Sequence, residues 1–141
     1  MFLSRTHLQP RVLLIEDSEE TLELSRLTLE SQACDVVGVS SAESALGLLN
    51  AGERFDLLFT DVCLGGASGI DAAHRVREAQ PQLPILVTSG LEPRDVLPLL
   101  GPGMHFLPKP YCMSELLDAI RLCFQRSAQP PGNAAAGPRA A

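Results

Sequence analysis

Short apolar runs alternate with longer amphipathic segments along most of this sequence, and no other feature restricts the possible fold as strongly. The apolar runs predict buried strands at 11–16, 34–39, 55–60, 83–88 and 104–107. The longer segments predict helices at 18–31, 41–51, 70–79, 93–100 and 114–126. Strands separated by helices are joined by right-handed crossovers into a parallel sheet. The strands are apolar almost throughout, which indicates an α/β fold with helices on both faces of the sheet.

Serine residues mark several expected helix starts, because a serine oxygen can accept a hydrogen bond from a free backbone N–H of the first turn. The expected caps are Ser18, Ser41 and Ser114. The helix at 93–100 is expected to be short because Pro98 lies inside it. The glycine-rich segment 63–69 is expected to be a loop.

Composition supports one domain and excludes several classes of function. The chain has 141 residues, of which 45% are apolar and 20% charged, a balance typical of a packed core. Its net charge of -6 argues against direct binding of DNA or RNA, which depends on neutralising phosphates. No apolar stretch is long enough to insert into a membrane, and the first residues lack the apolar centre of a signal peptide. We therefore expect a cytoplasmic protein.

The two ends of the chain and its cysteines add little chemistry. Residues 1–9 read as an N-terminal extension, and residues 127–141 lack apolar anchors and predict a disordered tail. The four cysteines form no C-x-x-C pair. We expect them to be small core residues in a reducing compartment rather than disulfide or zinc ligands.

Polar residues follow the expected strands where each strand ends, and ligands bind beyond these carboxyl ends in such sheets. They are Glu16, Asp17, Asp61, Ser89 and Lys109, the last being the only lysine of the chain. Carboxylate oxygens are the kind of ligand that Mg²⁺ prefers, and a carboxylate can also act as a nucleophile to form an aspartyl phosphate. An ammonium and a hydroxyl group can donate to phosphate oxygens. The sequence therefore predicts phosphoryl chemistry at this edge of the sheet.

Five segments carry a resemblance to a known family. They are Val12-Leu-Leu-Ile-Glu16-Asp17, Leu57-Leu-Phe-Thr-Asp61-Val, Gly69, Pro84-Ile-Leu-Val-Thr-Ser89-Gly90 and Phe106-Leu-Pro-Lys109-Pro110. In this order and spacing they resemble the receiver domain of two-component response regulators, of the single-domain type. The resemblance implies a receiver domain over residues 10–126. It also implies a doubly wound, flavodoxin-like sheet of five parallel strands in the order 2-1-3-4-5.

The resemblance assigns an acceptor and a metal site. Asp61 is expected to take a phosphoryl group from a phosphohistidine on a sensor histidine kinase or a histidine phosphotransfer protein. Asp17 and Asp61 are expected to bind Mg²⁺ directly, together with the backbone carbonyl of Cys63. Glu16 is expected to hold the ion through water.

The resemblance also assigns a switch. Lys109 is expected to pair with the acceptor carboxylate and then with the phosphoryl group, and its peptide bond to Pro110 is expected to be cis. Strand alternation from Pro84 places Ser89, rather than Thr88, where a hydroxyl moves to bind the phosphoryl group. Phe106 matches the aromatic side chain that swings inward in response.

This reading implies a signalling switch and not a metabolic enzyme. After phosphorylation the chain is expected to signal by protein contact or by phosphorelay, as a monomer or a weak dimer. Cys63 and Leu91 occupy positions whose side chains often tune dephosphorylation in the family, and neither can readily orient an attacking water. We therefore expect the phosphorylated form to be long-lived.

Two other functions compete with this reading. A phosphatase or phosphotransferase with an aspartate nucleophile usually carries a second aspartate two residues later, where this chain has Cys63. A degenerate receiver would bind partners without phosphorylation, but the intact acidic set and Lys109 argue against it. The chain can be a free-standing protein or the receiver of a hybrid kinase.

The first expected helix carries two leucine pairs on opposite sides. At 100° per residue Leu24 and Leu27 lie close together, and Leu22 and Leu29 lie nearly opposite them. One pair is expected to face the sheet, while the other is expected to be exposed where a kinase docks in the family. We expect that Leu22→Asp slows phosphotransfer with little loss of stability.

Overall fold

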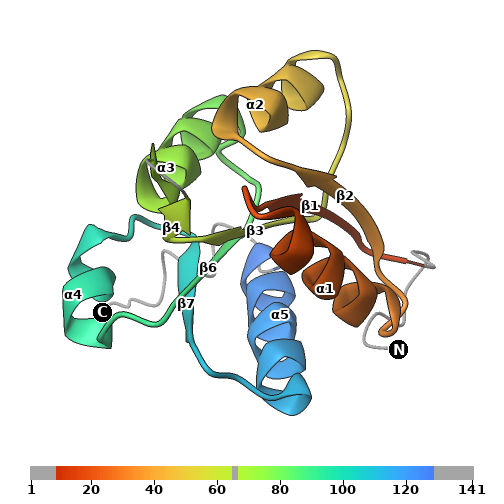
Figure 1. Ribbon diagram of the computed structural model, residues 1–141. Helices are drawn as coiled ribbons and strands as arrows, with labels where there is room; N and C mark the ends of the chain where they lie inside the picture. The colour runs from red at the N-terminus through yellow and green to blue at the C-terminus, as the bar shows by residue number, and fades with distance from the viewer. Residues whose placement is uncertain (1–8, 65–66, 129–141) are drawn as a thin grey trace.

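The computed structural model describes residues 9–64 and 67–128, and its centre is a sheet of five parallel strands (Figure 1). The strands are β1 (Arg11–Ile15), β2 (Asp35–Val39), β3 (Leu57–Asp61), β6 (Ile85–Ser89) and β7 (Met104–Pro108). They lie side by side in the order β2-β1-β3-β6-β7. Counted within this sheet, that order is 2-1-3-4-5, so the predicted topology is confirmed.

Helices cover both faces of the sheet, as Figure 1 shows, with α2 and α3 on one side and α1 and α5 on the other. They are α1 (Glu19–Glu30), α2 (Ala42–Asn50), α3 (Gly69–Ala79), α4 (Pro93–Val96) and α5 (Met113–Ala128). Successive strand residues alternate between the two hydrophobic layers, because neighbouring side chains of a strand point to opposite faces. On β1, Leu13 and Ile15 pack with α2 and α3, whereas Val12 and Leu14 pack with α1 and α5.

The fourth helix is short, as predicted. α4 ends at Val96 and passes into a 3-10 turn, η1 (Leu97–Leu99), which contains Pro98. Proline has no backbone N–H to donate to the preceding turn, so a longer α-helix is disfavoured here.

The predicted start and end of the last helix are wrong. α5 begins at Met113, and the N–H of Leu116 donates to the carbonyl of Cys112 at 3.1 Å, so Ser114 lies inside the helix. The carboxylate of Glu115 accepts the N–H of Cys112 at 2.9 Å, which supplies the cap from within the first turn. The helix also continues to Ala128, two residues into the predicted tail, whose remaining residues lie outside the described part of the chain.

The segment predicted as a loop contains two short strands, β4 (Cys63–Leu64) and β5 (Ala67–Ser68), which pair antiparallel. Ser68 is both the last residue of this hairpin and the N-cap of α3. Its hydroxyl accepts the N–H groups of Ile70 and Asp71 at 3.1 and 3.3 Å. The cap and the hairpin together fix the start of α3 beside the end of β3.

The two leucine pairs of α1 are separated as predicted. Leu29 is buried and Leu22 packs against the same core, whereas Leu24 and Leu27 are 64% and 54% exposed. Leu22 lies against Gly38 of β2, where an added Cβ would come within 2.8 Å of its side chain. The choice of Leu22 as the exposed leucine, on which the Leu22→Asp prediction rested, is therefore wrong, because this residue faces the domain and Leu24 and Leu27 form the exposed face.

The cysteines divide into two groups. All four are free thiols, with Cys34 and Cys123 buried and Cys63 and Cys112 exposed. Burial raises the pKa of the Cys34 thiol to about 11 and that of the Cys123 thiol to about 12. The core prediction is correct for this pair and wrong for the other, because Cys63 begins the short strand β4 beside the site and Cys112 directly precedes α5, where both are exposed. Within residues 9–64 and 67–128, no helix is long and apolar enough to cross a membrane.

Candidate functional site

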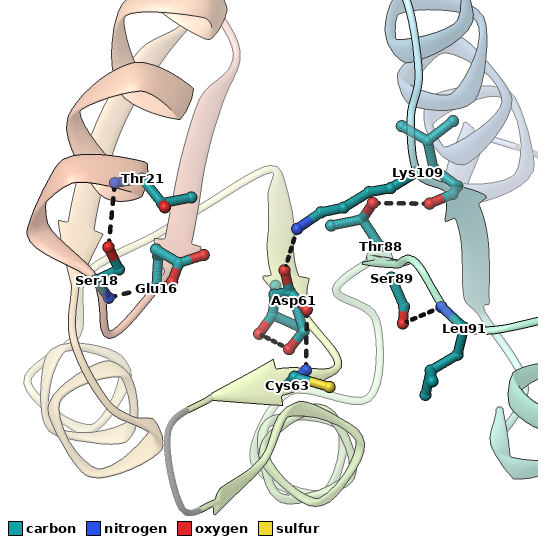
Figure 2. A network of polar contacts seen from close by, with 11 residues as sticks. Glu16, Ser18, Thr21, Asp61, Cys63, Thr88, Ser89, Leu91 and Lys109 are labelled. Carbon is teal, nitrogen blue, oxygen red and sulfur yellow. Dashed lines mark hydrogen bonds and ion pairs between the residues drawn. The ribbon is translucent and has the colours of Figure 1, made fainter.

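The carboxyl ends of β1, β3, β6 and β7 meet at one edge of the sheet, and the candidate site lies there (Figure 2). Asp61 is the last residue of β3 and pairs in register with Thr88 of β6. The preceding residues 57–60 are buried, so their packing between the two helical layers fixes the position of Asp61. Only 12% of its side chain is exposed.

Both oxygens of the Asp61 carboxylate have partners, as Figure 2 shows. Oδ1 accepts the backbone N–H of Cys63 at 2.9 Å, and Oδ2 accepts a hydrogen bond from the ammonium of Lys109. Charge-assisted contacts of this kind are stronger than neutral hydrogen bonds. They hold the carboxylate in one orientation at the mouth of the site.

Gly69 allows the start of α3 to lie directly against the backbone of the acceptor residue. A Cβ added at this position would lie 1.7 Å from the carbonyl oxygen of Asp61 and 2.9 Å from the Cα of Val62. Those atoms are backbone and cannot move away without shifting β3. A glycine is therefore required here for close approach, which explains this member of the five sequence segments.

Lys109 reaches the site from the end of β7, between two prolines. Its backbone N–H donates to the carbonyl of Ser89 at 2.8 Å, and its peptide bond to Pro110 is cis, as predicted. Burial alone would lower the pKa of the ammonium, but the hydrogen bond and charge of Asp61, with smaller contributions from Tyr111 and Glu16, outweigh it. The net pKa of Lys109 is raised, so the side chain is a cation at neutral pH.

Glu16 and Asp17 follow β1 on the other side of Asp61. Glu16 is only 8% exposed, and its Oε2 accepts the N–H of Ser18 at 3.1 Å. Burial is the main cause that raises the pKa of Glu16; the Ser18 contact lowers it, and the nearby Asp61 and Asp17 raise it further. Asp17 is exposed at the rim. Three carboxylates are therefore close enough to affect one another.

The oxygen donors at this edge are of the type that binds Mg²⁺ in proteins. In the described part of the chain, no three acidic, histidine or cysteine side chains are gathered tightly enough to hold a metal by themselves. Mg²⁺ needs no such cage, because it is usually bound through one or two carboxylates and keeps several waters. Oxygen donors crowded by like charge, as Glu16 is by Asp61 and Asp17, suit a hard cation.

The two predicted switch residues are placed beside the site and not on the acceptor. Ser89 is 2% exposed, and its hydroxyl accepts the N–H of Leu91 at 3.0 Å. Phe106 is half-buried against the layer that contains α3. No hydrogen bond joins Ser89 to Asp61 in this structure; Figure 2 shows its hydroxyl turned toward Leu91.

Sequence reasoning missed two residues near the acceptor. A small pocket of about 50 Å³ beside Asp61 and Lys109 is also lined by Thr21 of α1 and Tyr111. Burial raises the pKa of the Tyr111 phenol, Lys109 opposes this, and Asp61 and Glu16 add to it. The position of Tyr111, two residues after Lys109, was a weak signal in the sequence; Thr21 gave none, since its role depends on how α1 packs.

The comparisons with known proteins agree with this geometry. The model of the response regulator receiver domain matches residues 12–121. The transcriptional regulatory protein CpxR of Escherichia coli K12 is 33% identical over 118 residues, 83% of this chain and 50% of CpxR. The cell cycle transcriptional regulator CtrA of Caulobacter vibrioides is 31% identical over 119 residues, 83% of this chain and 51% of CtrA. This chain thus spans about half the length of both regulators.

A solved structure supports the same assignment over nearly its whole length. The response regulator receiver protein from Sinorhizobium medicae WSM419 superposes with a TM-score of 0.75 at 26% identity, covering 84% of this chain and 97% of that protein. Sequence match, sheet order and solved structure coincide over the described domain. The chain belongs to the response regulator receiver domain family.

Proposed function

We propose that this chain is a phosphorylation-dependent switch that accepts a phosphoryl group on Asp61 from the phosphohistidine of a sensor histidine kinase or a histidine phosphotransfer protein. One observation carries the proposal. The Asp61 carboxylate is held between the Cys63 N–H and the Lys109 ammonium at the carboxyl edge of a parallel sheet, where ligands of this fold class bind.

The transfer itself needs mainly positioning and neutralisation of charge. A carboxylate oxygen of Asp61 attacks phosphorus, a P–O bond forms, and the P–N bond to the histidine breaks. The imidazole leaves with the electron pair of that bond and takes up a proton. Lys109 keeps the carboxylate oriented before the attack and donates to phosphoryl oxygens after it.

Mg²⁺ is the proposed cofactor, held by Asp17, Asp61 and the carbonyl of Cys63, with Glu16 acting through water. When bound, the ion supplies positive charge that stabilises the carboxylates and the phosphoryl oxygens. The raised pKa of Glu16 supports this assignment, because it reflects a burial and crowding of negative charge that a cation relieves. The side chains contribute the oxygen donors, and the ends of β1 and β3 fix their positions.

Ser89 and Phe106 carry the response to phosphorylation in this proposal. The Ser89 hydroxyl exchanges the N–H of Leu91 for a phosphoryl oxygen, which moves the turn after β6. Phe106 then rotates from its half-buried position into the space that the turn vacates. The signal passes to a downstream protein by contact with the altered surface, or onward by phosphorelay, and involves no direct contact with nucleic acid.

The phosphorylated form is expected to be long-lived. Cys63 lies two residues after Asp61, and Leu91 lies two residues after Ser89. Both side chains are exposed, and neither carries a carboxylate or amide that could orient an attacking water. A phosphorylated lifetime of only seconds would contradict this part of the proposal.

The kinase is proposed to dock on the exposed face of α1. Leu24 and Leu27 are the exposed apolar residues there, and Glu20 and Glu23 are exposed beside them. A partner surface that is apolar and basic would complement this face. The chain is proposed to act in the cytoplasm as a monomer or a weak dimer, with its receiver domain ending with α5 at Ala128.

Intact mass spectrometry tests the acceptor assignment. The full chain is incubated with Mg²⁺ and acetyl phosphate, and we expect the mass of one added phosphoryl group. Asp61→Asn should show no gain, whereas Asp71→Asn, which changes an exposed aspartate of α3, should react as the native chain does. No gain in the native chain would favour a receiver that binds partners without phosphorylation.

A further inference from the structure

Thr88 is a buried polar residue that follows the three apolar residues of β6. Ile85, Leu86 and Val87 of β6 are fully buried, and Thr88 itself is only 5% exposed. A buried hydroxyl costs stability unless it is hydrogen-bonded. Its Oγ1 donates to the backbone carbonyl of Leu107 at 2.7 Å, across to the neighbouring strand β7 (Figure 2).

This hydrogen bond lies where β7 has few backbone donors of its own. Pro108 and Pro110 have no N–H, so Lys109 carries the only backbone donor between 108 and 110. That N–H donates to the carbonyl of Ser89 at 2.8 Å. The end of β6 therefore holds the segment before the Lys109 side chain at two points, the Leu107 carbonyl and the Lys109 N–H.

Thr88 also lies on the same side of the sheet as the ion pair of the site. It lines the pocket of about 50 Å³ together with Asp61, Lys109 and Tyr111. Ser89, the next residue along the strand, points to the opposite face, as strand alternation requires. Thr88 and Ser89 thus differ in what they can control: Ser89 can reach a phosphoryl group, and Thr88 reaches the strand that carries Lys109.

The geometry points to Thr88 as a positioning residue for Lys109. Its hydroxyl fixes the carbonyl of Leu107, and this fixes the two-residue span from which the Lys109 ammonium reaches Asp61. Valine has the shape of threonine without the donor, so Thr88→Val leaves the packing in place and removes the tether. The inference rests on the proposed function, because it assigns Thr88 to the positioning of the residue that neutralises the acceptor.

The kinetic test measures phosphoryl incorporation from acetyl phosphate by intact mass, as a function of acetyl phosphate concentration. We expect Thr88→Val to lower the maximal rate about tenfold, the scale of a small misplacement of a reacting group, without changing the half-saturating concentration. Thr88→Ser keeps the hydroxyl and should restore most of the rate. A native rate in Thr88→Val, or equal losses in both variants, would overturn the assignment.

A matched control separates positioning from general loosening. Ile120→Val removes one methyl group from a fully buried side chain of α5, on the same face of the sheet, and leaves every hydrogen bond of the site intact. We expect it to lower the melting temperature and leave the rate unchanged. If it slows phosphorylation as much as Thr88→Val does, the effect of Thr88 is packing alone and the inference is wrong.

A second readout does not depend on phosphorylation. Lys109 is the only lysine, so ¹⁵N-lysine labelling gives one side-chain ammonium signal in the NMR spectrum. In Thr88→Val we expect this signal to move toward its position in Asp61→Asn, where the ion pair is removed. An unmoved signal would contradict the inference even if the chain is never phosphorylated, and failure of phosphorylation alone would sink only the proposed function.

Discussion

Each of the two edges of the main sheet has three carboxylates near one basic residue, yet the two groups differ in pairing and burial. At the amino edge, Arg11 contacts Glu53 at 2.9 Å and Asp35 at 3.5 Å, and its backbone N–H donates to Asp56 at 2.7 Å. At the carboxyl edge, here named the acceptor edge, the Lys109 ammonium contacts Asp61. Glu16 is held there by the N–H of Ser18 and crowded by other carboxylates.

Solvent exposure separates the two groups further. The side chains of Asp35 and Glu53 are 55% and 42% exposed, so water stabilises their charges, and exposed pairs of this kind contribute little to stability. Glu16 is 8% exposed, and its negative charge is costly in the absence of a ligand. The carboxylates at the amino edge are therefore stabilised by contacts within the protein and by water. Those at the acceptor edge retain negative charge that an external cation can neutralise.

The largest expected effect compares a glycine from each edge. Gly69→Ala places a Cβ 1.7 Å from the Asp61 carbonyl, and we expect a loss of about 3 kcal/mol or more in the free energy of unfolding. Gly52, near Glu53 at the amino edge, has open space around it and a φ of +93°. Gly52→Ala should cost only about 1–2 kcal/mol, from backbone strain alone. Urea unfolding measures both, and equal losses would show that close approach does not govern Gly69.

The next largest effect tests whether the surface that the kinase contacts extends from the acceptor edge onto α1. Leu24→Asp should slow phosphotransfer from the cognate kinase about tenfold, equivalent to ~1.4 kcal/mol of docking free energy. Its rate with acetyl phosphate should not change, because a small donor needs no docking surface. Leu22→Asp is the matched control: it should lower the melting temperature, since Leu22 packs against the core. Native transfer from the kinase in Leu24→Asp would remove α1 from the docking surface.

A smaller effect compares the removal of one carboxylate from each edge. In the absence of divalent cations at pH 7, Glu16→Gln should raise the free energy of unfolding by about 1 kcal/mol, because a buried, crowded charge is removed. Asp56→Asn should lower it by about 1 kcal/mol, because the charge-assisted hydrogen bond that the Asp56 carboxylate accepts from the backbone N–H of Arg11 is weakened. Urea unfolding in a chelator tests both, and changes of the same sign would mean that the edges do not differ as described.

The pH dependence of the Glu16→Gln effect has a definite sign. The folded-state pKa of Glu16 is raised above its ordinary value of 4.5, so the folded state binds the proton more tightly than the unfolded state. The native chain therefore gains stability as pH falls, and the contribution is fully present below 4.5 and lost as pH rises through the folded pKa. The advantage of Glu16→Gln should be largest at neutral pH and vanish below pH 4.5; an advantage that grows on acidification would contradict the burial of this charge.

The sequence was enough to predict the strands and the strand-end residues, because apolar runs and turn residues are local signals. Asp61, Lys109 and Glu16 could be placed at one edge since parallel strands bring their carboxyl ends together. The start of α5 was mispredicted because Glu115 supplies the cap from inside the helix, and a serine cap is only a statistical signal.

The other features that the sequence did not predict depend on tertiary contacts. Periodicity separated Leu22 from Leu24, but only the packing of α1 against Gly38 decides which of them is exposed. The exposure of Cys63 and the tether from Thr88 to Leu107 likewise depend on how neighbouring segments meet. These features arise from the three-dimensional fit of segments whose local patterns carry no such information.

Dependence of phosphorylation on Mg²⁺ is the most direct test of the difference between the two edges. Phosphoryl incorporation from acetyl phosphate is measured by intact mass across a Mg²⁺ titration, in the native chain and in Asp17→Asn. We expect negligible incorporation in a chelator, saturation with Mg²⁺ in the native chain, and a half-saturating Mg²⁺ concentration raised about tenfold or more in Asp17→Asn. Equal incorporation with and without Mg²⁺, or an unchanged titration in Asp17→Asn, would contradict it.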